Sequence, residues 1–268
     1  MKLLAIDMDG TLLNSRNYVS NKQLTFLKNL DTKNSFHVAV TTGRPVEGVL
    51  NMLPEEIKKK IYIIGLNGSV LVDQSLNMIN SYSLSPLEFR EIQQFSKKIN
   101  TDVSVLDAKG FYTTAEEVTD LMKHDVGLNK MDMQQIQEDN VQYLDIIAKV
   151  LLFFEPERME EVKNTIPKEF FNQFSVIFSQ PYLVEFLPKG INKGTTILSL
   201  ANHLNVDRKD IVAIGDGLND LSMLKIAGVS IGMENSVAEV LSNVDHITLS
   251  NDNDGVQYAI ENYILKKA

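Results

Sequence analysis

Short apolar runs alternate with helical segments at both ends of this chain. In the N-terminal part the apolar runs lie at residues 3–6, 36–40 and 61–66. Runs of this length that alternate with helices are typical of βαβ units, whose parallel strands are buried on both faces of a sheet. The same alternation returns from about residue 192, with a strand expected at 210–215. The two ends of the chain therefore predict one α/β domain with a parallel sheet.

The pattern changes in the middle of the chain. Residues 102–114 and 174–188 each contain two apolar segments separated by a turn, which predicts two β-hairpins. A strand is expected within 144–156, and a charged helical stretch follows it at 157–165. Hairpins combined with helices indicate a separate α+β unit inserted into the first domain. We therefore expect a core in two parts, 1–83 and 185–268, and an inserted domain at 84–184.

Two carboxylates, Asp7 and Asp9, follow the first apolar run directly. Residues i and i+2 of a strand point to the same side, so both side chains are expected to face one point at the carboxyl end of the strand. Open parallel sheets bind their ligands at that edge. Two carboxylates that converge there repel each other unless a proton or a cation lies between them. A hard, oxygen-seeking ion such as Mg²⁺ would supply that cation.

Other polar residues follow the remaining predicted strands. Thr42 and Gly43 come after the second strand and offer a hydroxyl and an unobstructed backbone N–H. The turn GDGLND at 215–220 adds two further acids and an asparagine, and Lys189 and Lys193 precede a predicted helix. Acids that hold a metal ion, together with a lysine, a hydroxyl and amides that balance phosphoryl charge, are typical of a phosphoryl-transfer site.

Composition excludes several classes of function. The net charge of −9 argues against a nucleic-acid partner and against anionic membranes. The chain has no cysteine, which excludes disulfides and thiolate chemistry and fits a reducing compartment. Asp7 interrupts the first apolar run before a signal peptide could form, and the apolar stretch 146–154 is too short to span a bilayer. We therefore expect a cytoplasmic protein.

Four of these segments resemble the motifs of the haloacid dehalogenase (HAD) superfamily. They are DMDGTLL, TTGRP, the lysine of KGINKGT, and GDGLNDLSML, in that order along the chain. The inserted unit lies between the second and third motifs, as in the Cof-type sugar phosphatases with a large α/β (type IIB) cap. The resemblance implies a Rossmann-like core with an inserted α+β cap. It also implies Mg²⁺-dependent hydrolysis of small phosphate monoesters, with sugar phosphates favoured.

The resemblance assigns a role to each matching residue. Asp7 matches the nucleophile that becomes an aspartyl-phosphate, and Asp9 matches the acid/base that protonates the leaving oxygen and then activates water. Thr42 and Gly43 match the groups that contact the phosphoryl oxygens, and Lys193 matches the lysine that neutralises nucleophile and phosphate together.

The remaining roles concern the metal and the phosphate. The metal is implied at Asp7, Asp216 and the backbone carbonyl of Asp9, with Gly217 beside Asp216. Asp220 is implied to orient Lys193 or the metal shell. The predicted phosphate contacts beyond those already named are the backbone amide of Met8, Asn219 and Arg44.

Some positions keep two interpretations at this stage. Arg44 could contact the substrate or the cap, or could pair with an acid of the core. Asn67 and Gly68 could only turn the chain, or could line the mouth of the cavity. Lys189 is expected to be solvated. Specificity in this family comes from the cap. Three residues in or after the predicted cap hairpins could reach a sugar hydroxyl: Tyr112, Tyr182 and Glu185.

Other activities share parts of the pattern. A phosphomutase would return the phosphoryl group to its substrate, and the sequence does not separate it from a hydrolase. A receiver-like phospho-aspartate switch also places acids, a threonine and a lysine at strand ends, but it is a much shorter single domain and lacks the second aspartate at the position of Asp9. An ion-pump core would need membrane spans, and no apolar run here is long enough.

Overall fold

The computed structural model describes residues 1–34, 36–129 and 131–265. The chain forms two compact units. The first unit comprises Met1–Gly43, Met52–Asn80 and Asn192–Ala268, and the second comprises Arg44–Asn51 and Ser81–Ile191. The boundary expected after residue 184 falls inside strand β11 (Leu183–Pro188), which belongs to the sheet of the second unit, so the chain leaves that unit only after this strand. No helix in the described part of the chain combines the length and the apolar character needed to cross a bilayer.

The first unit is built on an eight-stranded sheet. In spatial order its strands are β14 (His246–Ile247), β13 (Val229–Gly232), β12 (Ile211–Gly215), β1 (Lys2–Asp7), β2 (Phe36–Thr41), β3 (Ile61–Gly65), β4 (Val70–Val72) and β5 (Met78–Ser81). The strands from β14 to β3 are parallel, whereas β4 runs antiparallel to β3. The predicted parallel-sheet α/β fold is therefore confirmed.

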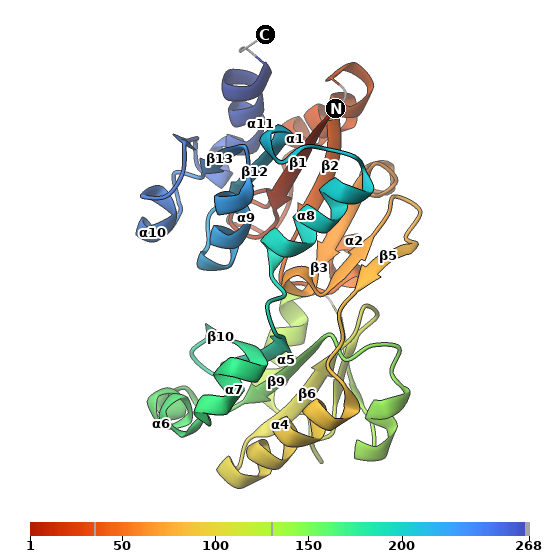
Figure 1. The fold of residues 1–268 in the computed structure, drawn as a ribbon, viewed down its shortest axis with the longest axis vertical. Helices are drawn as coiled ribbons and strands as arrows, with labels where there is room; N and C mark the ends of the chain where they lie inside the picture. Colours follow the sequence, from red (N-terminus) through yellow and green to blue (C-terminus); the bar gives the residue numbers. More distant parts are fainter. Residues whose placement is uncertain (35, 130, 266–268) are drawn as a thin grey trace. The chain divides into compact units, whose positions relative to one another are not determined.

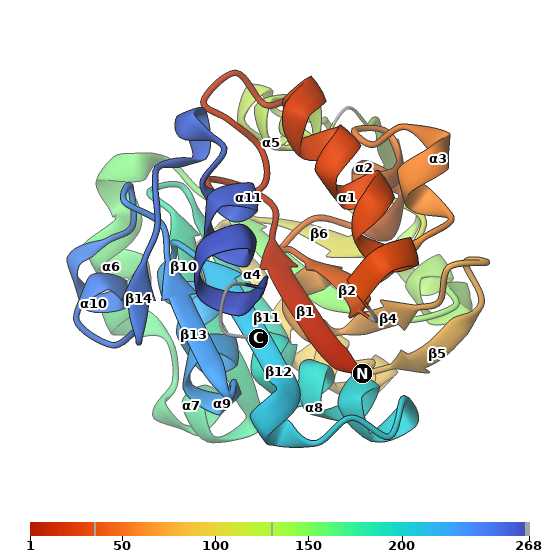
Figure 2. The same ribbon diagram turned by 90° about the horizontal axis from the view of Figure 1, so that it is seen from above.

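Helices cover both faces of this sheet, which explains why its central strands are apolar throughout (Figures 1 and 2). Helices α1 and α11 lie on one face, and α8 and α9 lie on the other. The helices of this unit are α1 (Asn21–Asn34), α3 (Glu55–Lys58), α8 (Lys193–His203), α9 (Leu221–Ile226), α10 (Ala238–Leu241) and α11 (Gly255–Ala259), the last continued by a π-helical segment (Ile260–Leu265). Ser20 caps the start of α1, because its hydroxyl accepts the N–H of Gln23 at 3.1 Å.

Strand β1 occupies the centre of the sheet, between β12 and β2. Ile6 is paired with Ile214 on one side and with Val40 on the other, and Asp7 is paired with Thr41. Its residues from Leu3 to Asp7 are all buried. This register brings the carboxyl ends of three strands to one place and holds the strand that ends in Asp7 from both sides.

The second unit has a six-stranded sheet. In spatial order its strands are β10 (Phe174–Gln180), β11, β9 (Lys149–Phe153), β6 (Asp102–Leu106), β7 (Phe111–Thr113) and β8 (Met133–Gln135). The predicted hairpins are confirmed as the antiparallel pairs β6/β7 and β10/β11. The helices of this unit are α2 (Val46–Leu50), α4 (Pro86–Ile99), α5 (Asp120–Leu128), α6 (Met159–Thr165) and α7 (Lys168–Gln173).

An aromatic cluster lies in the core of the second unit. The rings of Phe170, Phe174 and Phe186 meet edge to face, with centroids 5.2 to 6.0 Å apart. Phe186 is fully buried, and its neighbours on β9 and β11 point their alternate apolar side chains into the same core. This core gives the inserted unit its own source of stability.

Phe186→Ala should therefore lower the free energy of unfolding by about 3–5 kcal/mol, because it leaves a cavity in a close-packed core. Phe171, which is 42% exposed, provides the matched control. Phe171→Ala should change stability by about 0.5 kcal/mol or less. Urea unfolding of both variants tests this, and equal losses would show that the cluster does not stabilise the unit.

Candidate active site

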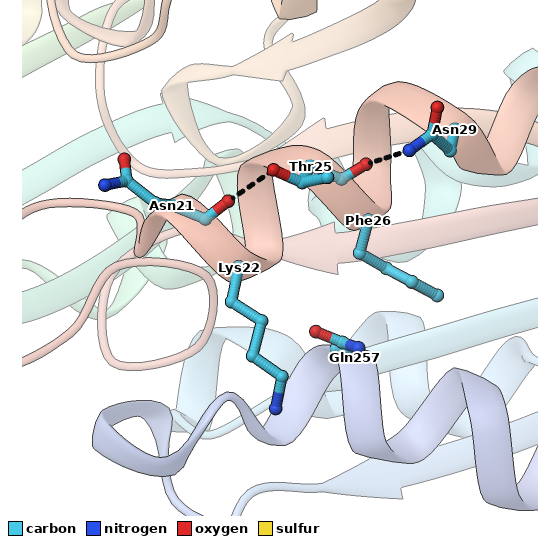
Figure 3. Close-up of a pocket in the computed structure, with 6 residues that line it drawn as sticks. All are labelled: Asn21, Lys22, Thr25, Phe26, Asn29 and Gln257. Carbon is cyan, nitrogen blue, oxygen red and sulfur yellow. Dashed lines mark hydrogen bonds between the residues drawn. The ribbon is translucent and has the colours of Figure 1, made fainter.

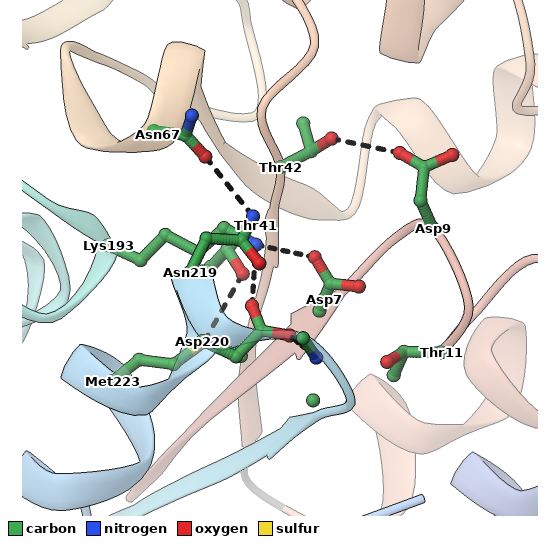
Figure 4. Close-up of polar contacts among 12 residues, drawn as sticks. Asp7, Asp9, Thr11, Thr41, Thr42, Asn67, Lys193, Asn219, Asp220 and Met223 are labelled. Atoms are coloured by element: carbon green, nitrogen blue, oxygen red, sulfur yellow. Dashed lines mark hydrogen bonds and ion pairs between the residues drawn. The ribbon is translucent and has the colours of Figure 1, made fainter. Parts of the chain in front are cut away.

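Polar side chains from several segments meet at the carboxyl ends of the parallel strands (Figure 4). Asp7 is the last residue of β1, Thr42 directly follows β2, and Asp216 directly follows β12. Lys193 is the first residue of α8. Because β12, β1 and β2 are parallel neighbours, their ends lie side by side.

The ammonium of Lys193 lies at the centre of this cluster. The side chain is fully buried, and its Nζ donates to Oδ1 of Asp7 at 2.5 Å and to Oδ1 of Asp220 at 2.6 Å. Burial by itself disfavours the charged form, but the carboxylates of Asp220 and Asp7 outweigh that effect and raise the pKa of Lys193. The lysine is therefore a fixed positive charge next to Asp7.

The start of α8 is held firmly, which fixes the base of the lysine side chain. The side chain of Asn192 caps the helix by accepting the N–H of Thr195 at 3.0 Å. A Cβ atom at position 194 would lie only 2.4 Å from the carbonyl oxygen of Ser222, so glycine lets the helix approach the segment that follows Asp220.

Asp220 braces the loop after β12. Its Oδ2 accepts the backbone N–H groups of Asp216 and Gly217, both at 2.9 Å, while its Oδ1 accepts from Lys193. Both oxygens are thus already occupied by protein donors. This arrangement supports the orienting role that the resemblance implies for Asp220.

Asp216 is held by two residues for which the sequence analysis gave no role. Its Oδ1 accepts from the hydroxyl of Thr11 at 2.7 Å. Gly10 has a φ of +78°, and a Cβ there would lie 2.4 Å from Oδ2 of Asp216, so a larger residue would exclude the carboxylate. The only sequence signal was that glycine and threonine directly follow Asp9.

The carboxylates form a candidate metal site. Asp7, Asp216 and Asp220 each offer an oxygen, and these atoms lie within 4.8 Å of one another. Burial and the neighbouring carboxylates raise the pKa of Asp7 well above its usual range, and burial raises the pKa of Asp216 to about 6. Three carboxylates and one ammonium leave two negative charges unbalanced when all are ionised. Hard oxygen donors with this excess charge fit Mg²⁺, and Asp7 and Asp216 are its best candidate ligands because Asp220 is engaged elsewhere.

Asp9 is placed differently from the sequence-based expectation. Strand β1 ends at Asp7, so the alternation of a strand does not apply to Asp9, which lies in the turn beyond it. Its Oδ2 accepts from the hydroxyl of Thr42 at 3.4 Å. Asp9 is exposed whereas Asp7 is buried. One carboxylate is thus fixed beside Lys193, and the other can exchange protons with water.

Two other predicted phosphate contacts, Asn219 and the backbone of Met8, also lie in the first unit. The Nδ2 of Asn219 donates to Oδ1 of Asn67 at 3.3 Å, which gives Asn67 a place in the site that the sequence analysis left open. The backbone of Met8 follows Asp7, and its buried side chain anchors the turn.

Residues of the second unit make contacts within that unit. The guanidinium of Arg44 donates to the carbonyl of Leu128 and to Oδ1 of Asn129. Glu185 forms a buried ion pair with Lys149 at 2.9 Å and also accepts from Ser179. Contacts of Arg44 or of Glu185 with a substrate stay predictions.

A pocket elsewhere in the first unit offers no comparable chemistry. It lies between α1 and α11 and is shown in Figure 3. Its lining consists of amide, hydroxyl, lysine and phenyl side chains: Asn21, Lys22, Thr25, Phe26, Asn29 and Gln257. The lining contains no carboxylate, so we place the candidate active site at the strand ends.

Because the pKa of Asp216 is raised, the free energy of unfolding of the metal-free protein should depend on pH. An unfolded aspartate titrates near pH 4, so between about pH 4 and pH 6 the folded state binds more protons and stability falls as pH rises. In chelator, Asp216→Asn should raise the melting temperature relative to wild type at pH 7.5 and not at pH 4. Asp207, whose side chain is 75% exposed, gives the control variant Asp207→Asn, which should show no such difference. An equal shift at both pH values would contradict the assignment.

Known proteins resemble this chain along almost its whole length. Residues 4–260 match the family of haloacid dehalogenase-like hydrolases. The Bacillus subtilis 5-amino-6-(5-phospho-D-ribitylamino)uracil phosphatase YcsE is 28% identical over 267 residues, covering 99% of this chain and 96% of its own.

Solved structures agree with the family match. A haloacid dehalogenase-like hydrolase from Bacteroides thetaiotaomicron superposes with a TM-score of 0.86 at 28% identity, covering 97% of this chain and 98% of its own. A sugar phosphatase of HAD subclass IIB, BT4131, has a TM-score of 0.81 at 19% identity, over 98% of this chain and 99% of its own, and so shares the fold. The chain belongs to the haloacid dehalogenase-like hydrolases.

Proposed function

We propose that this HAD-type phosphatase hydrolyses small phosphate monoesters, with sugar phosphates as the favoured class, through a phosphorylated Asp7 and with Mg²⁺. The observation that carries the proposal is the buried contact of Lys193 with both Asp7 and Asp220 at the strand ends, next to Asp216. A fixed cation beside a carboxylate places positive charge where a phosphoryl group and its attacking oxygen would meet.

In the first step an oxygen of Asp7 attacks phosphorus, the new Asp7–phosphorus bond forms, and the bond to the leaving oxygen breaks. Asp9 donates a proton to that oxygen, so an alcohol departs. Lys193 offsets the charge of the phosphoryl oxygens, and the Thr42 hydroxyl with the backbone N–H groups of Gly43 and Met8 provides further donors.

In the second step Asp9 accepts a proton from water, whose oxygen attacks phosphorus. The bond to Asp7 then breaks and inorganic phosphate leaves, which restores the carboxylate of Asp7 and the protonated form of Asp9 with which the first step began. The exposure of Asp9 suits this exchange of protons with water, and the burial of Asp7 suits a nucleophile whose geometry must stay fixed.

Mg²⁺, when bound, would balance the carboxylate charge and the charge that develops on the phosphoryl oxygens. The residues proposed to hold it are Asp7 and Asp216, with the backbone carbonyl of Asp9 and with Gly217 beside Asp216. Asp220 keeps Lys193 and the backbone of residues 216–217 in place.

The substrate class is supported by the relatives. One relative is named as the phosphatase of a phosphorylated ribitylamino compound, and one fold neighbour is described as a sugar phosphatase. Both descriptions, together with the hydrolase family, favour transfer of the phosphoryl group to water over the mutase and receiver alternatives. A cytoplasmic location stays a prediction from composition.

Asp7→Asn should reduce turnover of phosphate monoesters about a thousandfold or more, because it removes the nucleophile and keeps the shape of the side chain. Asp9→Asn should also stop turnover, but it should still transfer phosphate slowly to Asp7 from an ester with a good leaving group. Acid-quench labelling with a ³²P-labelled aryl phosphate measures this difference. Label on Asp7 is expected with Asp9→Asn and none with Asp7→Asn.

The exposed control Asp207→Asn should keep wild-type turnover. More than a tenth of wild-type activity in Asp7→Asn would remove that residue from the chemistry. If the Asp9→Asn variant carried no ³²P label, the proposed acid/base role of Asp9 would be contradicted.

Activity should disappear in chelator and return with Mg²⁺, and Ca²⁺ should not restore it. Ca²⁺ takes more ligands at longer distances than the near-octahedral Mg²⁺, and so it would hold Asp7 differently. Asp216→Asn should raise the Mg²⁺ concentration needed for half-maximal activity. Full activity in chelator would refute the metal requirement.

A further inference from the structure

Three consecutive residues in the first unit have a left-handed backbone. Leu66, Asn67 and Gly68 have φ values of +53°, +55° and +107°. Among residues other than glycine, asparagine tolerates this conformation comparatively well, whereas leucine rarely adopts it. Such a conformation persists only where the surrounding contacts impose it.

The contacts that impose it come from two segments of the candidate active site. The N–H of Asn67 donates to the carbonyl of Thr42 at 2.9 Å, and the N–H of Thr42 donates to Ile64 at 2.9 Å. On the other side, the carbonyl of Gly68 accepts from the Thr196 hydroxyl of α8 at 2.7 Å. The segment thus joins the loop after β2 to the helix that begins with Lys193.

The side chain of Asn67 points into the site and is 7% exposed. Its Oδ1 accepts from Nδ2 of Asn219 at 3.3 Å, as Figure 4 shows. The same Oδ1 lies 3.3 Å from where a Cβ of Gly43 would be. The amide therefore fills the space between the backbone of Gly43 and the side chain of Asn219.

This contact determines how Asn219 presents its amide. The last torsion of an asparagine is soft, and the amide can turn over so that oxygen and nitrogen exchange places. Donation to an oxygen of Asn67 fixes the nitrogen on that side. The second N–H of Asn219 then has a fixed direction in the amide plane and is ready to donate to a phosphoryl oxygen.

We propose that Asn67 is a positioning residue for phosphate: its amide orients the donor of Asn219, and its left-handed backbone ties the Thr42–Gly43 loop to the start of α8. The inference rests on the proposed phosphoryl site and adds to it a residue that contacts donors of that site.

The test uses Asn67→Gly, which keeps the left-handed backbone accessible and removes the amide. Its dissociation constant for inorganic phosphate, measured by calorimetry with Mg²⁺, should rise about fivefold, as for the loss of one hydrogen bond. KM for a phosphate ester should rise by a similar factor, and kcat should change less than twofold. Asn67→Ala removes the same amide and strains the backbone, so it should weaken phosphate binding to the same extent and also lower the melting temperature.

A double-mutant cycle shows whether the effect passes through Asn219. Asn219→Ala should weaken phosphate binding, and adding Asn67→Gly to it should weaken binding little further. Three outcomes would each overturn the inference. Asn67→Gly could bind phosphate with wild-type affinity, or the losses in the cycle could be additive. The third outcome is a fall in kcat and melting temperature while the affinity for phosphate stays unchanged. Failure of the wild-type protein to bind phosphate or to hydrolyse esters would instead overturn the proposed function.

Discussion

A lysine ammonium enclosed by two carboxylates is the interaction on which the candidate site depends. Lys193 is fully buried, and its only stable state there is charged, because Asp7 and Asp220 contact it directly. Removing the lysine would leave two buried carboxylates without a positive partner, which is strongly unfavourable. Asp7, the helix that begins at Lys193 and the loop braced by Asp220 are therefore mutually dependent, and none can move without disturbing the others.

Close backbone approach makes this dependence geometrically feasible. Gly10 admits the carboxylate of Asp216, Gly194 admits the backbone at Ser222, and Gly68 lies against the carbonyl of Asn192. At each place a Cβ atom would come within 2.6 Å of another atom. The charged groups thus meet because small residues let the surrounding segments approach, and the parallel strands determine the direction from which those segments come.

Much of this arrangement could be predicted from the sequence because it depends on local patterns. Apolar runs that alternate with helices revealed the strand that ends at Asp7 and the strand that ends just before Asp216, and turn residues revealed the hairpins of the inserted unit. Contacts between distant segments left no such signal: the bond from Thr11 to Asp216 and the amide pair of Asn67 and Asn219 join residues more than 150 positions apart. The alternation of side chains along a strand does not explain the position of Asp9, because the strand ends two residues earlier, at Asp7. A turn instead places Asp9 beside Thr42.

The central position of β1 has a consequence for the order in which the protein is made. One edge of β1 pairs with β2, which leaves the ribosome early, but its other edge pairs with β12, which begins at Ile211. Until that strand emerges, the nascent chain carries an apolar strand with an unpaired edge, the kind of surface that attracts other chains. Most of the second unit, at 81–191, is meanwhile complete. The lysine that contacts Asp7 and the second strand that pairs with β1 thus come from the C-terminal part of the chain, so a nascent chain that ends before Ile211 lacks the complete surroundings of Asp7.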